Sequence, residues 1–329
     1  MKRLIAIAGL VFALIGLPAT SEARNIVVTN DDGLTSNVLA LYRTLKQSGH
    51  DVIVSVPCTN QSGMGAALII GRPLVSLHKD CRNGAAKAGS PGAGSMTRTG
   101  IDANDFYYVD GTPVMAMAYG VDVIGQRRWG KQPDLVLSGP NEGQNLGAII
   151  LSSGTVSAAQ AAAIRGIPAI ALSAGGNTID DKELANSDSA KVAALAAELV
   201  ARLDGLAGNA PLLPDGLALN VNFPDNLDGA GWRASRIGTY NSYTLRFVEN
   251  MARDSSPTMI AMAKQHGASL PQLPGLAIDI NNEAPSEIEQ DDEAVVYKTA
   301  IAVSPMQAGY EATTLDGWIA WMVAALEAK

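Results

Sequence analysis

The stretch that decides the fold is Asn25-Ile26-Val27-Val28-Thr29-Asn30-Asp31-Asp32-Gly33. Its β-branched apolar run predicts a first strand that ends at a polar turn. An amphipathic helix should follow, because apolar and aromatic side chains then recur at helical spacing: Val38, Leu41, Tyr42 and Leu45. Two carboxylates, Asp31 and Asp32, therefore lie where the strand stops. Ligands of open α/β sheets bind at that edge, although Asp-Gly is also ordinary turn chemistry.

Strand and helix patterns alternate along much of the remaining chain, which predicts an α/β fold with a mainly parallel sheet and crossover helices. The expected strands are 51–56, 67–77, 107–109, the apolar run before Ser138, 169–173 and 217–222, and the expected helices are 114–124, 156–165 and 187–203. Residues 82–105 are rich in small residues and predict a flexible loop. From about residue 234 the pattern changes, with strands expected at 242–248 and 294–303 and a closing helix at 315–326.

The N-terminus has the pattern of a secretory signal peptide. Lys2 and Arg3 precede the apolar run 4–17, and Ser21-Glu22-Ala23 is a small-x-small cleavage site. We expect cleavage after Ala23 and export to a bacterial periplasm or beyond it, with no membrane partner for the mature chain. An oxidising compartment favours a bridge between the two cysteines, Cys58 and Cys81, over two separate thiols.

Composition excludes some classes of protein. The chain has 329 residues, 47% of them hydrophobic and 17% charged, which is a globular composition. Its formal net charge is -8, so the basic surface needed to bind long nucleic acid is not expected. A small anionic substrate would need a metal ion or helix N-termini to offset this charge.

Oxygen-bearing side chains occur at the ends of several expected strands. Ser62 lies in the loop after the second strand, and Asn141 follows the strand that ends near Ser138. With Asp31 and Asp32 they form a donor set that suits hard divalent cations better than zinc. Ser153-Gly154-Thr155 precedes a helix and is either a simple N-cap or an anion site. Residues 125–132 resemble a P-loop, but they lack its final Ser or Thr and precede a strand.

Five short blocks occur in the order and spacing seen in SurE proteins, and the chain resembles that family from about residue 25 to 310. The blocks are Asn30-Asp31-Asp32-Gly33, Asn60-Gln61-Ser62-Gly63, Asp110-Gly111-Thr112-Pro113, 138–147 and Ser153-Gly154-Thr155-Val156. SurE proteins are 5'/3'-nucleotidases of the survival-protein type, some of which are called acid phosphatases. The chain departs from the usual family pattern at Pro140, Ala148, Ile149 and Ser152.

The resemblance implies a metal-dependent phosphomonoesterase that acts on nucleoside monophosphates, with one divalent ion (Mg²⁺, Mn²⁺ or Ca²⁺) per subunit. By position, the metal ligands are Asp31, Asp32, Ser62 and Asn141. Asp31 and Asp32 are the catalytic residues, and the nucleophile is either metal-activated water or an aspartate. Phosphate binding is expected at Gly63, Asn145, Ser153, Gly154 and Thr155.

The resemblance also implies a Rossmann-like three-layer core, expected here over residues 24–235. A C-terminal hairpin and helix arm, residues 236–329, would assemble a homodimer or homotetramer. Two other classes remain open at this stage. One is an exported α/β protein that binds a small anion without catalysis, and the other is a cell-envelope scaffold of enzymatic descent.

Overall fold

The computed structural model describes residues 23–180, 182–208, 210–265 and 268–310. Nearly all of the expected signal peptide and the whole expected helix 315–326 lie outside these ranges. Among the described residues no helix has the length and apolar character needed to cross a membrane.

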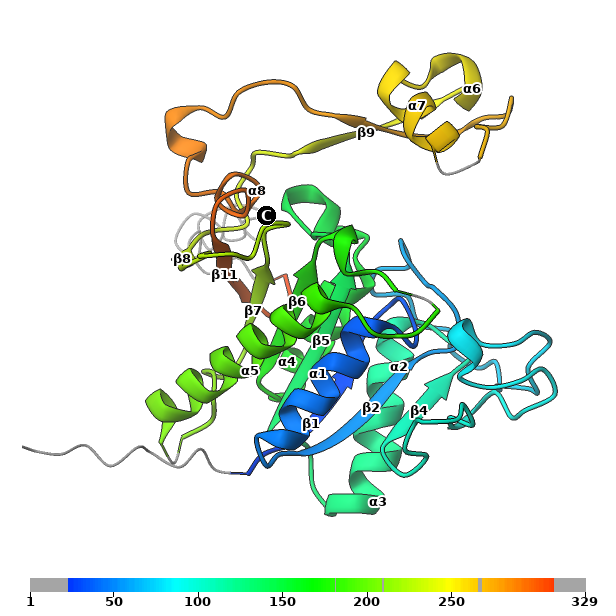
Figure 1. The fold of residues 1–329 in the computed structure, drawn as a ribbon, viewed down its shortest axis with the longest axis vertical. Helices are drawn as coiled ribbons and strands as arrows, with labels where there is room; N and C mark the ends of the chain where they lie inside the picture. Colours follow the sequence, from blue (N-terminus) through cyan, green and yellow to red (C-terminus); the bar gives the residue numbers. More distant parts are fainter. Residues whose placement is uncertain (1–22, 181, 209, 266–267, 311–329) are drawn as a thin grey trace, which may run out of the picture.

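A nine-stranded sheet forms the centre of the described structure, in the order β3-β4-β2-β1-β5-β6-β7-β11-β8 (Figure 1). The pairs from β4 through β2, β1, β5 and β6 to β7 are all parallel, whereas β3 pairs with β4, and β11 with β7, in antiparallel fashion. The bounds are β1 Asn25–Thr29, β2 Asp51–Pro57, β3 Ala93–Ser95, β4 Phe106–Val109, β5 Leu135–Glu142, β6 Ala169–Ala174, β7 Leu217–Asn222, β8 Trp232–Ala234 and β11 Ile301–Gln307. The expected α/β fold with a mainly parallel sheet is confirmed.

Helices cover both faces of the sheet, which gives three layers (Figure 1). Alternate residues of β1 face opposite sides: Ile26 and Val28 pack with α1 (Ser36–Gln47) and α5 (Ser187–Ala207), and Val27 packs with α2 (Pro113–Tyr119) and α4 (Gly154–Ile164). This burial on both faces explains the continuous apolar run of the first strand. After α2 come a π-helical segment, Gly120–Gly125, and α3, Gln126–Trp129. Short 3-10 helices lie at Arg82–Gly84, Gly147–Leu151, Gly176–Thr178 and Glu287–Glu289.

Three expectations from the sequence are wrong in detail. No strand forms at 67–77, where Gly71 has a φ of +76° and Pro73 has no N–H for a ladder. The expected loop 82–105 contains an ordered 3-10 helix and β3. Only the last part of the expected strand 294–303 is a strand, because α8 (Glu293–Val296) occupies its beginning and β11 starts at Ile301.

A hairpin projects from the sheet at the top of Figure 1 and forms an arm. It consists of β9 (Tyr243–Val248) and β10 (Gly275–Ile280), paired antiparallel, with α6 (Met251–Asp254) and α7 (Pro257–Gln265) between them. Within the range expected for the arm, however, β11 returns to the central sheet beside β7. The expected boundary after residue 235 therefore does not separate the whole sheet from the arm.

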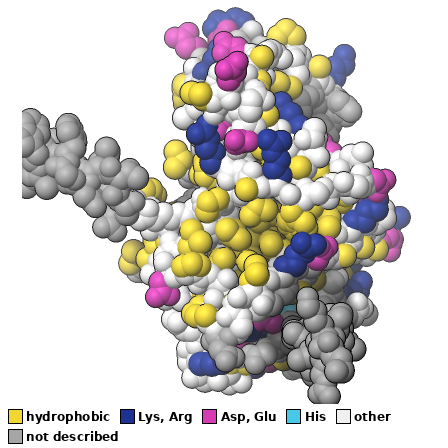
Figure 2. Space-filling model, turned by 90° about the vertical axis from the view of Figure 1, so that its left-hand side faces the viewer, with side chains coloured by type: hydrophobic (Ala, Val, Ile, Leu, Met, Phe, Trp, Pro, Cys, Tyr) yellow, Lys and Arg dark blue, Asp and Glu magenta, His cyan; other side chains and the backbone are white. Residues whose placement is uncertain are grey.

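Figure 2 shows one face of the molecule, with the arm above the sheet domain. Hydrophobic side chains gather across the middle of this face, and charged side chains of both signs are interspersed on the arm. This face has no continuous basic surface among the described residues, which agrees with the negative net charge.

Candidate active site

The strand order places the carboxyl ends of β1, β2 and β5 at one edge of the sheet. From β1 the chain crosses to β2 on one side and later returns to β5 on the other side of β1. Such a reversal leaves a crevice at the carboxyl ends, where ligands of open α/β sheets bind. The loops after β1 and β2 carry Asp31, Asp32 and Ser62, whereas Asn141 lies within β5, which continues to Glu142 and not only to about Ser138 as expected.

The turn after β1 is fixed by its own side chains. Asn30 Nδ2 donates to the Gly33 carbonyl oxygen at 2.8 Å, and Gly33 N–H donates to Asn30 Oδ1 at 3.0 Å. Gly33 has a φ of +91°, and a Cβ there would lie 3.0 Å from the Pro57 carbonyl oxygen. Only glycine meets both requirements easily, so the loop after β1 packs tightly against the end of β2. Asp31 and Asp32 are both 3% exposed.

Asp31 lies against the N-terminus of α4. Thr155 Oγ1 donates to Asp31 Oδ1 at 2.6 Å, while Ser153 caps the helix by accepting the Val156 N–H at 3.1 Å. A Cβ on Gly154 would lie 2.7 Å from Asp31 Cβ and 3.0 Å from its Oδ2, so glycine is what permits this approach. Burial raises the pKa of Asp31, and hydrogen bonds from Thr155 and the Gly154 backbone oppose that rise.

These contacts bear on the residues that the sequence assigns to phosphate. Ser153 forms the N-cap that was one of the two alternatives, and Gly154 and Thr155 face the Asp31 carboxylate. Their role in phosphate binding stays a prediction.

Asp32 is held by the loop after β2 and by the end of β5. Asn60 Nδ2 donates to its Oδ1 and Glu142 N–H donates to its Oδ2, each at 3.0 Å. Burial raises the pKa of Asp32 to about 8, and the charges of Asp31 and Glu142 add to the rise. Because two buried acids with raised pKa values lie side by side, a cation between them would favour their ionised forms.

Asn141 lies next to this pair, because its neighbour Glu142 bonds to Asp32. Its Nδ2 donates to the Gly143 carbonyl oxygen at 2.8 Å. Its Oδ1 is buried, and no donor within the described part of the chain meets it. Buried polar atoms without a partner are uncommon and call for an explanation. A hard cation between this amide oxygen and the two carboxylates would supply one.

The loop that carries Ser62 is bonded to the turn with the two acids, but the structure shows no contact from the Ser62 side chain to either acid. Gln61 N–H donates to the Asp31 carbonyl oxygen at 2.7 Å, and Ser62 N–H donates to Asn60 Oδ1 at 2.9 Å. Ser62 and the following Gly63 are exposed. The described residues contain no group of three His, Cys, Asp or Glu side chains arranged to hold a metal, so the fit depends on two carboxylates and an amide oxygen.

Asn145 has a structural role that the sequence did not indicate. Its N–H donates to Asn222 Oδ1 at 2.9 Å, and its carbonyl oxygen accepts from Asn220 Nδ2 at 2.9 Å. Glu293 completes this buried network by accepting from Asn220 Nδ2 and from Gly147 N–H, both at 2.9 Å. Burial raises the pKa of Glu293 to about 7. The network ties the loop after β5 to β7 and to the base of the arm.

Sequence reasoning missed Arg82 at this site. Its Nη2 donates to Glu142 Oε2 at 2.8 Å, and its Nη1 donates to the Asp32 carbonyl oxygen at 3.1 Å. Arg82 directly follows Cys81, which forms a disulfide with Cys58. The bridge settles the alternative left open for the two cysteines. Only the fold brings this loop, fifty residues after Asp32, to the acids.

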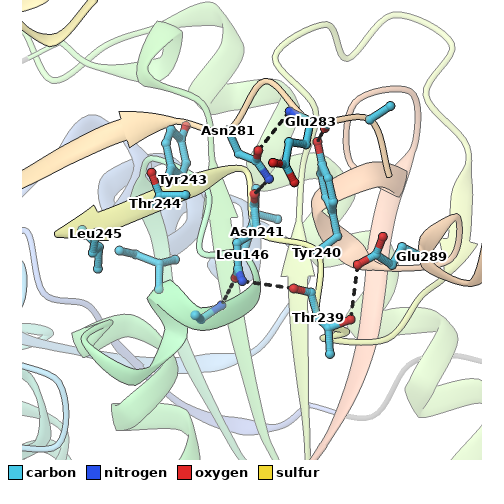
Figure 3. A pocket seen from close by; sticks show the side chains of 13 residues that line it. Leu146, Thr239, Tyr240, Asn241, Tyr243, Thr244, Leu245, Asn281, Glu283 and Glu289 are labelled. Carbon is cyan, nitrogen blue, oxygen red and sulfur yellow. Dashed lines mark hydrogen bonds between the residues drawn. The ribbon is translucent and has the colours of Figure 1, made fainter. Parts of the chain in front are cut away.

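A cavity of about 490 Å³ lies between the 146–149 segment and the base of the arm (Figure 3). Asn241 Oδ1 accepts from Ala148 N–H at 2.6 Å, and Asn281 Nδ2 donates to the Asn241 carbonyl oxygen at 2.8 Å. Tyr240 and Tyr243 add aromatic side chains to the lining. The cavity combines aromatic rings with amide and acidic groups, a mixture suited to a polar ring compound.

Comparisons with known proteins agree with this arrangement. The family model described as survival protein SurE matches residues 26–244. An acid phosphatase of Yarrowia lipolytica is 34% identical over 215 residues, 63% of this chain and 59% of its own length. The 5'-nucleotidase SurE 1 of Thermus thermophilus is 34% identical over 235 residues, 70% of this chain and 78% of its own length. The 5'-nucleotidase SurE of Thermosipho africanus is 38% identical to this chain over 151 residues, and the match spans 49% of its own length.

The chain thus spans between about half and three fifths of the length of the first relatives that it matches. The crystal structure of the SurE protein from Aquifex aeolicus superposes with a TM-score of 0.62 at 27% identity, covering 91% of this chain and 99% of that one. Since the family model covers more than half of the chain, the protein belongs to the SurE family.

Proposed function

We propose that this protein is a metal-dependent phosphomonoesterase that hydrolyses nucleoside 5'- or 3'-monophosphates to nucleoside and phosphate. The observation that carries the proposal is the buried, unpartnered Asn141 Oδ1 beside the adjacent acids Asp31 and Asp32, among the described residues. Relatives named 5'-nucleotidase SurE and acid phosphatase support the reaction class.

Asp31, Asp32 and Asn141 would hold the divalent ion, with Ser62 as a fourth ligand from the adjoining loop. Carboxylate, amide and hydroxyl oxygens are the donors that Mg²⁺, Mn²⁺ and Ca²⁺ prefer, so we propose one such ion per subunit. A bound ion of this kind would polarise a phosphoryl oxygen and help to generate the nucleophile.

The chain's own groups keep the acids in place for this chemistry. Thr155 Oγ1 and the N-terminus of α4 fix Asp31, and Asn60 together with the Glu142 N–H fixes Asp32. Donors from α4, from the loop after β2 and from the end of β5 thus hold the two carboxylates in the fold. Such preorganisation is what phosphoryl transfer requires of a protein. The phosphate itself we assign to Gly63, Asn145 and residues 153–155.

We assign the nucleoside to the cavity between the 146–149 segment and the arm (Figure 3). Tyr243 would stack on a base, and Glu283 or Asn281 would bond to ribose hydroxyls. The support is the position of this cavity, because Leu146, one of its lining residues, directly follows Asn145 on the loop after β5.

Self-association is the partner that we propose, as a homodimer or homotetramer. One face of the arm carries two apolar cross-strand pairs, Phe247 with Leu276 and Leu245 with Ile278. All four side chains are between 38% and 73% exposed, and a monomer gains nothing from this exposure. Light scattering should give a mass above that of one chain, and charged substitutions at Leu245 and Ile278 should lower it.

We also propose that the protein is exported. A disulfide between two buried cysteines is typical of oxidising compartments, and the N-terminal sequence has the features of a signal peptide. Mass spectrometry of the protein from a periplasmic fraction should find Arg24 as the first residue. A retained N-terminus would contradict export by this route.

The test of the activity uses the purified chain without residues 1–23. It is incubated with a nucleoside monophosphate or p-nitrophenyl phosphate, in Mn²⁺ or in EDTA, and released phosphate is measured. Release that requires the metal supports the proposal. Binding of the nucleotide without release would instead indicate an anion-binding protein, and neither binding nor release would indicate a scaffold.

A further inference from the structure

We propose that Arg82, tethered by the Cys58–Cys81 disulfide, is a positioning residue that neutralises Glu142 and so lowers the negative charge of the active site. The inference rests on the proposed phosphomonoesterase activity. It adds that Arg82 and the Cys58–Cys81 disulfide set the electrostatic surroundings of the catalytic acids.

Arg82 contacts two acidic residues of the site, Glu142 and Asp32. Its Nη2 lies 2.8 Å from Glu142 Oε2, and its Nη1 lies 3.9 Å from Asp32 Oδ1 and 3.1 Å from the Asp32 carbonyl oxygen. The Arg82 side chain is 17% exposed, and those of Glu142 and Asp32 are 6% and 4% exposed. Charges withdrawn from water in this way are poorly screened, so their balance matters for a ligand.

Counting charges shows what Arg82 changes. Asp31, Asp32 and Glu142 form one acidic cluster, since the Glu142 N–H bonds to Asp32 and the two aspartates are neighbours. With all three ionised, the guanidinium of Arg82 offsets one of their three negative charges. Without Arg82 the site would be more negative by one charge and would repel a phosphate dianion more strongly.

The disulfide keeps the arginine at this place. Cys58 directly follows β2, and Arg82 N–H donates to its carbonyl oxygen at 2.8 Å. The two cysteines are only 2% and 3% exposed, so the bridge lies within the protein beside the site. On the other side, Asn83 Nδ2 donates to the Leu34 carbonyl oxygen at 2.8 Å. The segment that carries Arg82 is thereby attached to the loops after both β1 and β2.

The first experiment compares Arg82→Met, Arg82→Lys, Glu142→Gln and the double variant Arg82→Met/Glu142→Gln. Calorimetry measures the affinity for Mn²⁺ alone, and steady-state kinetics with p-nitrophenyl phosphate gives KM and kcat. We expect Arg82→Met to bind Mn²⁺ more tightly while its KM rises roughly 10- to 100-fold, the range typical of residues that orient metal ligands. Arg82→Lys keeps the positive charge, so its Mn²⁺ affinity and KM should stay near the wild-type values, and the double variant should reverse most of the KM increase seen in Arg82→Met.

These opposite signs separate charge balance from simple support of the fold. If Arg82 only stabilised the loop, Arg82→Met would weaken Mn²⁺ and substrate together, and removing Glu142 would not rescue it. Either result overturns the proposal. If the wild-type protein shows no metal-dependent phosphate release, the proposed function fails, whereas the Mn²⁺ titrations still report on the charge assigned to Arg82.

The second experiment removes the tether by the paired substitution Cys58→Ser/Cys81→Ser. Made in the wild-type background it should raise KM in the same direction as Arg82→Met, with unfolding curves used to confirm that the chain folds. Made in the Arg82→Met/Glu142→Gln background it should change KM little, because no charge pair is left to position. An equal loss in both backgrounds would show that the bridge acts on stability alone and would overturn its assigned role.

Discussion

Replacing Gly154 by alanine should abolish the proposed phosphatase activity through Asp31. A Cβ at this position would lie 2.4 Å from Pro113 Cγ, 2.7 Å from Asp31 Cβ and 3.0 Å from Asp31 Oδ2. Carbon atoms prefer separations of about 3.5 to 4.0 Å, so the helix and the carboxylate must move apart by roughly 1 Å. A displacement of that size can cost roughly 100-fold in rate, and overpacking typically costs about 1 to 3 kcal/mol of stability.

The assay is kcat/KM for p-nitrophenyl phosphate in saturating Mn²⁺, with thermal unfolding measured on the same samples. Gly205→Ala is the matched control, since Gly205 lies in α5 and a Cβ added there would meet no neighbour within 4 Å among the described residues. It should keep full activity and gain up to about 1 kcal/mol of stability. Thr155→Val adds no volume but removes the 2.6 Å hydrogen bond to Asp31, and should lower kcat/KM by roughly 10- to 100-fold. If Gly154→Ala folds and retains kcat/KM within about threefold of wild type, the contact between α4 and Asp31 does not serve catalysis.

Three further predictions follow from burial and from the cavity. Burial raises the pKa of Glu293 from 4.5 to about 7, so between these pH values the folded state holds a proton that the unfolded state loses. The free energy of unfolding should therefore fall by up to about 3 kcal/mol as pH rises from 4.5 through 7. Denaturant titrations should show a flatter pH dependence for Glu293→Gln. Burial raises the pKa of Asp32 from 3.8 to about 8, so without metal the stability that comes from its protonated form is lost as pH rises through that range. The increase in Tm on adding Mn²⁺ should therefore be larger at pH 8 than at pH 5.5. An equal increase at both pH values would argue against binding at Asp32. Tyr243→Ala should raise KM for a nucleoside monophosphate roughly 10-fold and leave KM for p-nitrophenyl phosphate unchanged, whereas equal effects on both would place the nucleoside elsewhere.

The sequence predicts the central sheet well because its strands are buried on both faces. Runs such as Asn25–Thr29 and Leu217–Asn222 are apolar throughout most of their length, and the helices between them begin at recognisable caps such as Thr112-Pro113. The errors occur where tertiary contacts decide the local structure. At 294–300, α8 forms because the buried Glu293 side chain is held by Gly147 and Asn220, which no local pattern reveals.

The site was predicted in part for a similar reason. Asp31 and Asp32 follow β1, and Asn141 lies at the carboxyl end of β5. Parallel strands bring their carboxyl ends to one edge, so the proximity of these residues could be inferred. The pairing of Arg82 with Glu142 could not, because it joins a loop rich in small residues to a strand end sixty residues away. The network around Asn145 had one available signal, since Asn220 and Asn222 alternate on β7 and therefore face the same side.

The most direct test of the account is a crystal structure with Mn²⁺, located by anomalous scattering. The account predicts one ion per subunit, within about 2.0 to 2.6 Å of carboxylate oxygens of Asp31 and Asp32 and of Asn141 Oδ1. An ion bound elsewhere, or a site in which Asn141 Oδ1 does not face the metal, would contradict the claim that these three side chains form the metal centre of a phosphomonoesterase.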